Sequence, residues 1–353
     1  MSTSSSPASP EILRRNRILS SKLYFDVPPS KVPLIYSSTY NISFLGMEKL
    51  HPFDSSKWGR ICQFLASAGI LEKSCIIEPE EASNEDLLVV VHPEEYLISL
   101  KSSLTVAKIV QVPPVAMLPN CIVQRKILDP FRKQVGGSIL AAKLAKERGW
   151  AINVGGGFHH CSADKGGGFC VYADISLCIH FAFVQLNISR VMIIDLDAHQ
   201  GNGHEIDFAE DRRVYILDMY NCEVYPLDFN ARRYIDQKVE IASGTTTDVY
   251  LKKLDDALEV ARQKFNPELV VYNAGTDILD EDPLGCVRIS PDGIIKRDEK
   301  VFAFARDKGS PILMLTSGGY MKSSARVIAD SIINLSKKQL IDMQGTQNME
   351  KKV

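Results

Sequence analysis

The stretch VMIIDLDAHQGNG, residues 191–203, joins an apolar, β-branched run directly to a group of polar residues and glycines. A short run that is apolar at nearly every position is typical of a strand covered on both faces, as in a parallel sheet. Similar runs recur elsewhere: VPLIYS from Val32, LLVVV from Leu87, WAINV from Trp150, VYILD from Val214, LVVYNAG from Leu269 and PILMLT from Pro311.

Segments with the helical spacing of apolar residues lie between several of these runs, over residues 135–146, 248–265 and 323–335. Strands that alternate with helices indicate a doubly wound α/β fold. We therefore predict a single three-layer α/β domain over residues 31–343, with a mostly parallel central sheet flanked by helices. Residues 1–30, rich in Ser and Arg, are predicted to be a flexible arm or, alternatively, an organelle transit peptide. Residues 344–353 are predicted to be a polar tail.

Composition excludes several classes of protein. Of the 353 residues, 41 are Lys or Arg and 43 are Asp or Glu, so a net charge of −2 disfavours nucleic-acid binding as the main function. No apolar run approaches the roughly 20 residues of a membrane-spanning helix, and we expect no membrane partner. The eight cysteines are scattered without a C-x-x-C pair, which indicates reduced thiols rather than disulfides or a cysteine-type zinc site.

Four of the predicted strands run directly into polar or glycine-rich sequence: GGGFHH at 155–160, DLDAHQGNG at 195–203, NAGTD at 273–277 and TSGGY at 316–320. In open parallel sheets, ligands bind beyond the carboxyl ends of the strands. These segments, far apart in the chain, are therefore expected to meet at one edge of the sheet.

The D-x-D-x-H segment predicts a metal site. Asp195, Asp197 and His199 alternate, so on a strand they share one face. Leaving such groups unpaired in an apolar interior costs ~2–7 kcal/mol each, and more for charges, which a divalent cation would offset. Asp197 and His199, with Asp277 from another strand end, would be three protein ligands with an open position, typical of catalytic zinc. The alternative is a salt-bridge cluster without metal.

Two further groups point to chemistry at the same edge. His159 and His160 follow three glycines, whose backbone freedom lets both rings face a cavity, where a histidine can take up and return a proton. Tyr320 follows Gly318-Gly319, and its phenol could donate to an oxyanion. The alternatives are a buried histidine pair with satisfied hydrogen bonds and a packed surface tyrosine. A dinucleotide-binding turn is disfavoured because His160 stands where the fingerprint needs glycine.

Together these segments resemble the zinc-dependent histone deacetylase family, with its arginase/deacetylase fold, over about residues 30–340. The matching motifs, in chain order, are GGGFHH, GGFC, DLD-x-H, G-x-D and GGY. The segment HPFD at 51–54 and the run DAHQGNGH from Asp197 are most similar to the class IV subgroup. The resemblance implies hydrolysis of an acyl group, acetyl or long-chain, from lysine side chains of histones or other proteins.

The resemblance also implies roles for individual residues. Asp197, His199 and Asp277 would hold one zinc ion, and His160 would act as general base and then acid. The supporting catalytic residues it implies are His159, Asp195, Asn202 and Tyr320, with Tyr320 polarising the acyl carbonyl. The substrate-binding residues it implies are Gly168, Phe169, Tyr225, Gly318 and Gly319. Phe169 would line a narrow tunnel, although packing in the core is the open alternative from sequence.

A potassium ion beside the zinc is implied as well, bound by backbone oxygens of Asp195, Asp197 and His199 with the side chain of Asp218. One position departs from the family: Asn202 stands where most members have aspartate, so a neutral amide replaces the carboxylate expected behind His160.

Other functions stay open at this stage. A two-metal ureohydrolase of the same fold would need a second aspartate where this chain has Leu279. A catalytically silent scaffold or acyl-lysine reader is the alternative from another class. The resemblance suggests a nuclear chromatin regulator with corepressor partners. The cytoplasm is an alternative location, as is a plastid or the mitochondrion if the Ser- and Arg-rich start is a transit peptide. Acyl-chain preference, protein substrate and oligomeric state are left undetermined.

Overall fold

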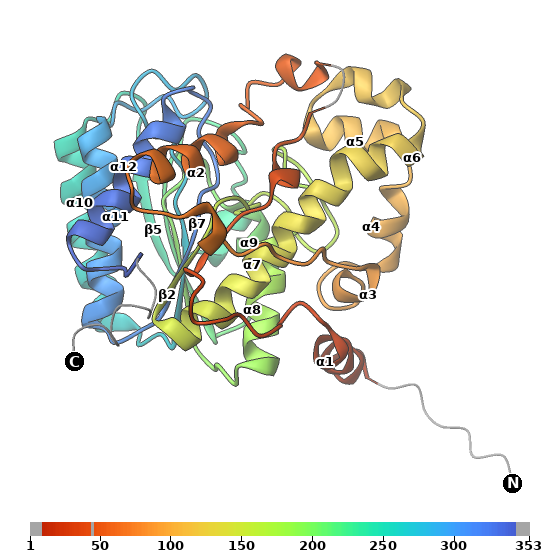
Figure 1. Cartoon of the computed structure of the whole chain (residues 1–353), viewed down its shortest axis with the longest axis horizontal. Helices are drawn as coiled ribbons and strands as arrows, with labels where there is room; N and C mark the ends of the chain where they lie inside the picture. The colour runs from red at the N-terminus through yellow and green to blue at the C-terminus, as the bar shows by residue number, and fades with distance from the viewer. Residues whose placement is uncertain (1–8, 44–45, 344–353) are drawn as a thin grey trace, which may run out of the picture.

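A sheet of seven strands in the order β1-β2-β7-β6-β3-β4-β5 forms the middle layer of the computed structural model, which describes residues 9–43 and 46–343 (Figure 1). The strands are β1 (Leu34–Ile35), β2 (Trp150–Asn153), β3 (Val191–Asp195), β4 (Val214–Asn221), β5 (Gln237–Ile241), β6 (Leu269–Asn273) and β7 (Ile312–Leu315). Every neighbouring pair is parallel. The predicted α/β fold is confirmed.

The central strands are apolar throughout because both faces of the sheet are covered. All five residues of β3 are buried. Val191 and Ile193 belong to one core cluster, whereas Met192 and Ile194 belong to the other. The alternation of strand side chains thus divides one apolar run between two cores, which is why the sequence is continuously apolar.

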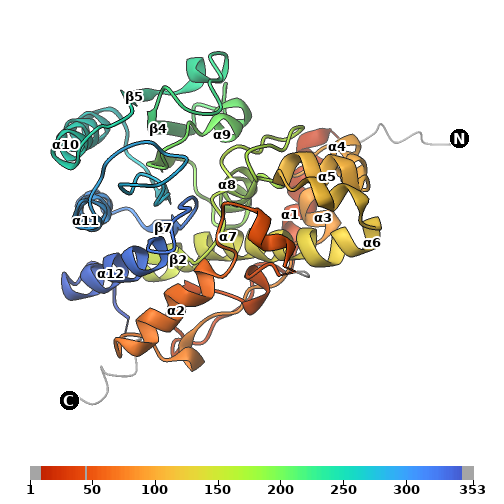
Figure 2. The same ribbon diagram turned by 90° about the horizontal axis from the view of Figure 1, so that it is seen from above.

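Helices cover both faces of the sheet, and Figure 2 shows the two sets on opposite sides. One set is α2 (Lys57–Ser67), α10 (Thr247–Lys264), α11 (Pro291–Asp307) and α12 (Ser324–Lys337). The other is α7 (Asp129–Arg148) and α8 (Asp174–Gln185), with α1 (Pro10–Ser20), α3 (Asn84–Leu87), α4 (Glu94–Ser99), α5 (Ser103–Val110) and α6 (Asn120–Val123) beyond them. The short helix α9 (Asn202–Asp207) follows β3.

One predicted strand is wrong, and one strand was missed. The run LLVVV contains the end of α3 and then a turn in which Val89 has a φ of +67°. Leu87 and Val90 are fully buried in the core without pairing to a strand, and a short apolar run cannot distinguish these two outcomes. The missed strand, β5, lies at the edge of the sheet, where its side chains alternate between partly buried and exposed before the buried Ile241.

The segment predicted to be a flexible arm contains an ordered helix. Ser9 caps α1 by accepting a hydrogen bond from the Ile12 amide, and Ile18 is fully buried. Helix α1 packs against α8, so the prediction of a flexible arm is wrong for this helix. Residues 1–8 and the predicted tail, residues 344–353, lie outside the described residues.

Two expectations from composition can be compared with the structure. All eight cysteines are free, as expected for reduced thiols. Among the described helices, none is long and apolar enough to cross a lipid bilayer.

Candidate active site

The loops that follow β2, β3, β6 and β7 meet at the carboxyl edge of the sheet, as the sequence predicts for parallel strands. The loops after β2, β3 and β7 line a cavity of about 160 Å³. The predicted site residues on its wall are His159, His160, Gly168, Phe169, Asp197, Gly318 and Tyr320. Segments separated by more than 150 residues in the chain therefore build one pocket.

Asp197, His199 and Asp277 lie together beneath this pocket, and each is at least 95% buried. The Nδ1 atom of His199 is 3.1 Å from Asp197 Oδ1 and 3.0 Å from Asp277 Oδ2. One ligand atom from each residue lies within 4.8 Å of the others. Two carboxylate oxygens and one imidazole nitrogen form a donor set that fits a divalent cation such as zinc.

The electrostatics of this triad follow from enclosing two carboxylates in one buried site. Burial, followed by repulsion from Asp197, raises the pKa of Asp277 to about 7. Burial alone would lower the pKa of His199, but its bonds to Asp197 and Asp277 raise it well above the usual value. The site therefore favours a positive charge between the two carboxylates, which either a proton or a metal ion can supply.

Two glycines make room for the carboxylates. A Cβ atom on Gly275 would lie 2.1 Å from Asp197 Oδ2, and one on Gly318 would lie 2.4 Å from Asp277 Oδ2. The amide of Gly318 donates to Asp197 Oδ2 at 3.1 Å. The glycine after β7 is therefore required by the close approach of the backbone to the triad.

The two adjacent histidines differ in their partners. His159 Nδ1 lies 2.9 Å from Asp195 Oδ2, whereas His160 Nδ1 lies 2.9 Å from the amide oxygen of Asn202. Burial would lower the pKa of His159, but Asp195 and Asp197 raise it to about 9. Burial and the charges of His159 and His199 lower the pKa of His160 well below its usual value. His160 is the member of the pair that stays neutral.

Aromatic rings surround the pocket mouth. The ring of Tyr320 has its centroid 6.0 Å from both Phe53 and Phe169, and 6.4 Å from His199. The Phe169 ring packs edge-on against His51 at 4.1 Å. Phe169 thus lines the pocket rather than lying in the core.

Three other predicted substrate residues lie around His160 and on the loop before Tyr320. Gly168 has a φ of +50°, and a Cβ there would lie 2.3 Å from His160 Cδ2. Tyr225 is 45% exposed, with its ring centroid 4.8 Å from that of His160. Gly319 has a φ of +121° and precedes Tyr320.

Asp218 is brought beside Asp195, since the two residues pair in register between β4 and β3. Its Oδ2 atom accepts from the Gly201 amide at 2.8 Å, whereas its buried Oδ1 atom has no hydrogen-bond partner among the described residues. Burial, Asp195 and Glu205 raise its pKa well above the usual value. A buried carboxylate oxygen that has no hydrogen-bond partner in the described ranges and lies near the acidic groups of Asp195 and Glu205 fits a site for a monovalent cation.

Sequence reasoning missed a buried lysine that supports the site. Lys57, the first residue of α2, is fully buried, and its Nζ atom donates to the carbonyl oxygens of Ser317 at 2.7 Å and Gly318 at 2.8 Å. It also lies 4.2 Å from the centroid of the Trp58 ring. Its partners are backbone oxygens of a distant loop, so no motif in the sequence points to it.

Arg297 of α11 was missed for the same reason. This fully buried side chain donates to the carbonyl oxygens of Leu196 at 3.2 Å and Ala274 at 3.4 Å. It also donates to the carboxylate of Asp298 at 2.9 Å. Arg297 therefore ties together the two loops that carry Asp197 and Asp277.

Replacing Lys57 with methionine is expected to lower the free energy of unfolding by about 3 kcal/mol, because buried carbonyl oxygens lose their hydrogen-bond donor. Catalytic rate should fall too, since those carbonyls belong to the loop that positions Tyr320. Chemical denaturation and kcat measurements check this. Lys322→Met, which alters an exposed lysine just after Tyr320, is the control. A Lys57→Met enzyme as stable and fast as the control would contradict the prediction.

Residues 51–335 match the histone deacetylase domain family. The chain therefore belongs to the histone deacetylase family, and the predicted enzyme class, a deacetylase-type hydrolase, is confirmed. Among its relatives is "Histone deacetylase 2" of Arabidopsis thaliana, 74% identical over 332 residues that cover 94% of this chain and 86% of the relative. Human "Histone deacetylase 1" is 27% identical over 285 residues, which cover 76% of this chain and 57% of that protein.

Solved structures agree with the fold. The crystal structure of the HDA15 HD domain superposes with a TM-score of 0.70 at 20% identity, covering 88% of this chain and 89% of that one. The structure of an HDAC homologue complexed with SAHA gives a TM-score of 0.68 at 23% identity, covering 87% and 83%. The predicted arginase/deacetylase-like architecture is confirmed by these likenesses.

Proposed function

We propose that this protein is a zinc-dependent lysine deacylase whose active site is the pocket above Asp197, His199 and Asp277. The main support for the proposal is the buried triad of two carboxylate oxygens and one imidazole nitrogen. Neutral His160 and Tyr320 line the cavity next to this triad. Three protein ligands leave a coordination position open for substrate or water. Leu279 stands where a second bridging aspartate would be needed, so one metal ion per chain is expected.

When bound, zinc would polarise the acyl carbonyl and lower the pKa of water towards ~7. His160 is held for proton transfer by Asn202. The Asn202 Nδ2 atom faces Asp228 at 3.4 Å, which leaves its Oδ1 atom as the acceptor for His160 Nδ1–H. The lone pair of neutral His160 is then on Nε2, which can accept a proton and return it to the departing lysine amine.

The remaining side chains would orient substrate and stabilise developing charge. Tyr320 lines the pocket within reach of the triad, and its phenol would donate to the oxyanion. Phe169 would flank the lysine stem, with Tyr225 on the exposed side of His160. Asp195 would hold His159, and His159 would stabilise charge beside His160. Asp218, with the backbone oxygens of Asp195, Asp197 and His199, would hold a potassium ion.

The proposal also covers the length of the acyl group that the enzyme removes. The same cavity continues along apolar side chains, namely Val110, Val112, Val115, Ile127, Phe131 and Phe158. An apolar wall of this kind stabilises a hydrocarbon chain by removing it from water. We propose that acyl groups longer than acetyl are accepted.

A panel of lysine peptides carrying acetyl, crotonyl and myristoyl groups tests both parts of the proposal. Zinc-loaded enzyme should hydrolyse at least one, with higher kcat/KM for the longer chains. Preference for acetyl would contradict the apolar-wall proposal alone. Peptide binding without hydrolysis of any member would instead favour the acyl-lysine reader, and neither binding nor hydrolysis would favour a scaffold.

Restoring a carboxylate behind His160 gives a prediction for pH dependence. His160 must be neutral to accept a proton, so the rate falls as pH drops through its pKa. A carboxylate stabilises the protonated ring, so Asn202→Asp should move the acidic limb of the kcat/KM profile upward by about 1 pH unit. Asn230→Asp, which adds the same charge at an exposed position, should leave the limb in place.

Asp228 needs a control of its own in that experiment, because it would face the new carboxylate across 3.4 Å. The double variant Asn202→Asp/Asp228→Asn removes this repulsion and should show the full upward movement. An unchanged acidic limb in both variants would contradict the prediction that a carboxylate at position 202 raises the pKa of His160.

The cellular setting is also a proposal. The sequence GNG at 201–203 and the segment HPFD at 51–54 support the class IV assignment. Similarity to proteins named histone deacetylase supports a nuclear chromatin regulator that represses transcription, acts on histone tails or other acylated proteins, and works with corepressors. Imaging of a fluorescent fusion, compared with one lacking residues 1–30, would distinguish the nucleus from the cytoplasm, a plastid or the mitochondrion.

A further inference from the structure

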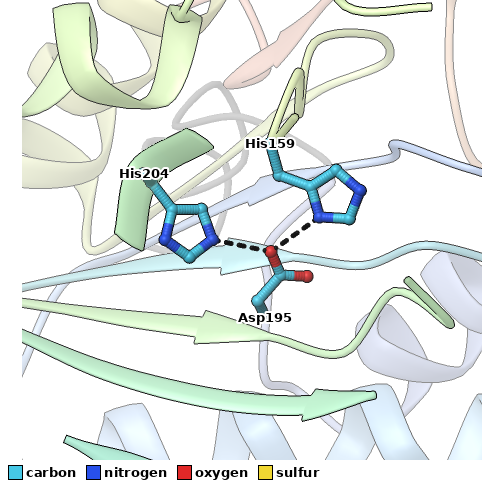
Figure 3. A group of neighbouring side chains, drawn as sticks. All are labelled: His159, Asp195 and His204. Atoms are coloured by element: carbon cyan, nitrogen blue, oxygen red, sulfur yellow. Dashed lines mark hydrogen bonds and ion pairs between the residues drawn. The ribbon is translucent and has the colours of Figure 1, made fainter. Parts of the chain in front are cut away.

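His204 is a buried histidine that the mechanism above does not use. It lies in the first turn of α9 and is 1% exposed. Its Nε2 atom is 2.8 Å from Asp195 Oδ2, the same oxygen that lies 2.9 Å from His159 Nδ1. Figure 3 shows the two rings reaching this carboxylate from opposite sides. One carboxylate oxygen therefore joins two histidines.

The shared oxygen determines which nitrogen atoms carry protons. A carboxylate accepts hydrogen bonds, so both facing nitrogens must donate: Nε2 of His204 and Nδ1 of His159. The other oxygen of Asp195 accepts from Asn273 Nδ2 at 3.0 Å and the Asp197 amide at 3.2 Å. Four donors thus fix this carboxylate, and His204 supplies one of the two side-chain donors on Oδ2.

No hydrogen-bond partner faces the other ring nitrogen of His204, Nδ1, within the described part of the chain. The bond to Asp195 is therefore the polar contact that this ring makes. A leucine would fill similar apolar space without a buried, unpartnered nitrogen, so packing alone does not explain a histidine here.

The neighbours of His204 bind the same pair of histidines. Asn202 contacts His160 Nδ1 at 2.9 Å, and the amide of Gly203 donates to the carbonyl oxygen of His159 at 2.8 Å. A Cβ on Gly203 would lie 2.3 Å from the carbonyl oxygen of Cys161, so the helix start is pressed against this segment. Asn202 and His204 thus hold the pair of histidines through their side chains, and Gly203 between them does so through its backbone amide.

We propose that His204 is a positioning residue of the active site, which anchors the Asp195 carboxylate and thereby holds His159 with its proton on Nδ1. This inference rests on the proposed function. Its consequence is that the first turn of α9 orients both histidines, His160 directly and His159 through Asp195.

Three substitutions separate hydrogen bonding from packing. In His204→Gln, the amide nitrogen stands about where Nε2 stands now, so the bond to Asp195 is kept. His204→Asn carries the same amide one methylene short of Asp195, and His204→Leu has no donor. We expect a loss in kcat of about 10–100-fold for Asn and Leu, as for other groups that orient active-site ligands. KM and zinc content should be unchanged in these variants. The His204→Gln variant should have a kcat within about fivefold of the wild-type value.

One further measurement and one control variant make the outcome decisive. The hydrogen-bonded Nδ1–H proton of His159, followed by NMR, should be protected from exchange in wild type and Gln, and should exchange faster in Asn and Leu. His180→Leu, which alters a histidine packed against Phe208 away from the pocket, is the control and should match wild type. Equal kcat and equal protection in Gln, Asn and Leu would overturn the proposal.

The NMR readout does not depend on turnover. If wild type hydrolyses no acyl-lysine peptide, the proposed function fails, and exchange of the His159 proton still decides the role of His204. If Leu does not fold, the comparison of Gln with Asn, which differ by one methylene, decides it.

Discussion

Asp277→Ala should lose zinc and with it all hydrolysis above background. Asp277 would supply one of the three buried ligand atoms of the proposed zinc site, and its Oδ1 atom also accepts from the Ala198 amide at 2.9 Å. Alanine leaves two ligands, too few to hold the ion against water. Metal analysis after dialysis should fall from one zinc per chain to near zero. Zinc should raise the melting temperature of the wild type but not of the variant.

Asp280→Ala is the matched control, because this exposed aspartate lies three residues further along the same loop. It should retain zinc and activity. Burial and Asp197 raise the pKa of Asp277 to about 7, so the ligand must release a proton to bind metal. Zinc affinity of the wild type should therefore weaken as pH falls below about 7. A zinc-loaded, active Asp277→Ala protein would show that the metal site lies elsewhere.

His160→Ala should lower kcat by about 10²–10⁴-fold while zinc content stays at one per chain. The side chain is 92% buried beside the triad and contacts Asn202, not a ligand carboxylate, so metal binding does not require it. Loss of activity with retained metal separates proton transfer from metal binding.

His180→Leu controls for loss of a histidine in this variant as well. The comparison uses single-turnover kinetics, which report the chemical step rather than product release. A His160→Ala enzyme with more than a tenth of wild-type kcat would assign the general base to another residue.

The sequence was sufficient to predict those parts of the site whose residues directly follow a strand. Parallel strands share one carboxyl edge, so the polar residues after β2, β3, β6 and β7 had to meet once the strands were recognised. Asp197 and His199 were predicted to lie beside Asp277, 78 residues further along the chain from His199, and they do. The assignment of Gly168 to substrate binding came from the family resemblance, not from periodicity.

Residues that support the site through backbone contacts were beyond such reasoning. Lys57 and Arg297 bind carbonyl oxygens, which every residue has, so their partners leave no pattern in the sequence. His204 directly follows the stretch 191–203 that decides the fold, yet its bond to Asp195 depends on the start of α9. The run from Leu87 failed because apolar residues can be buried by a turn as well as by a strand.

The bond between Lys57 and Ser317 spans 260 residues of chain. During synthesis on the ribosome, the lysine therefore emerges long before the loop that it binds. Until the segment after β7 has left the exit tunnel, the Lys57 amine and the aromatic rings beside it lack their cover, and contacts this distant in sequence form slowly. Nascent chains of this enzyme should accordingly need protection by chaperones, and no shortened form that ends before β7 should acquire a working catalytic centre.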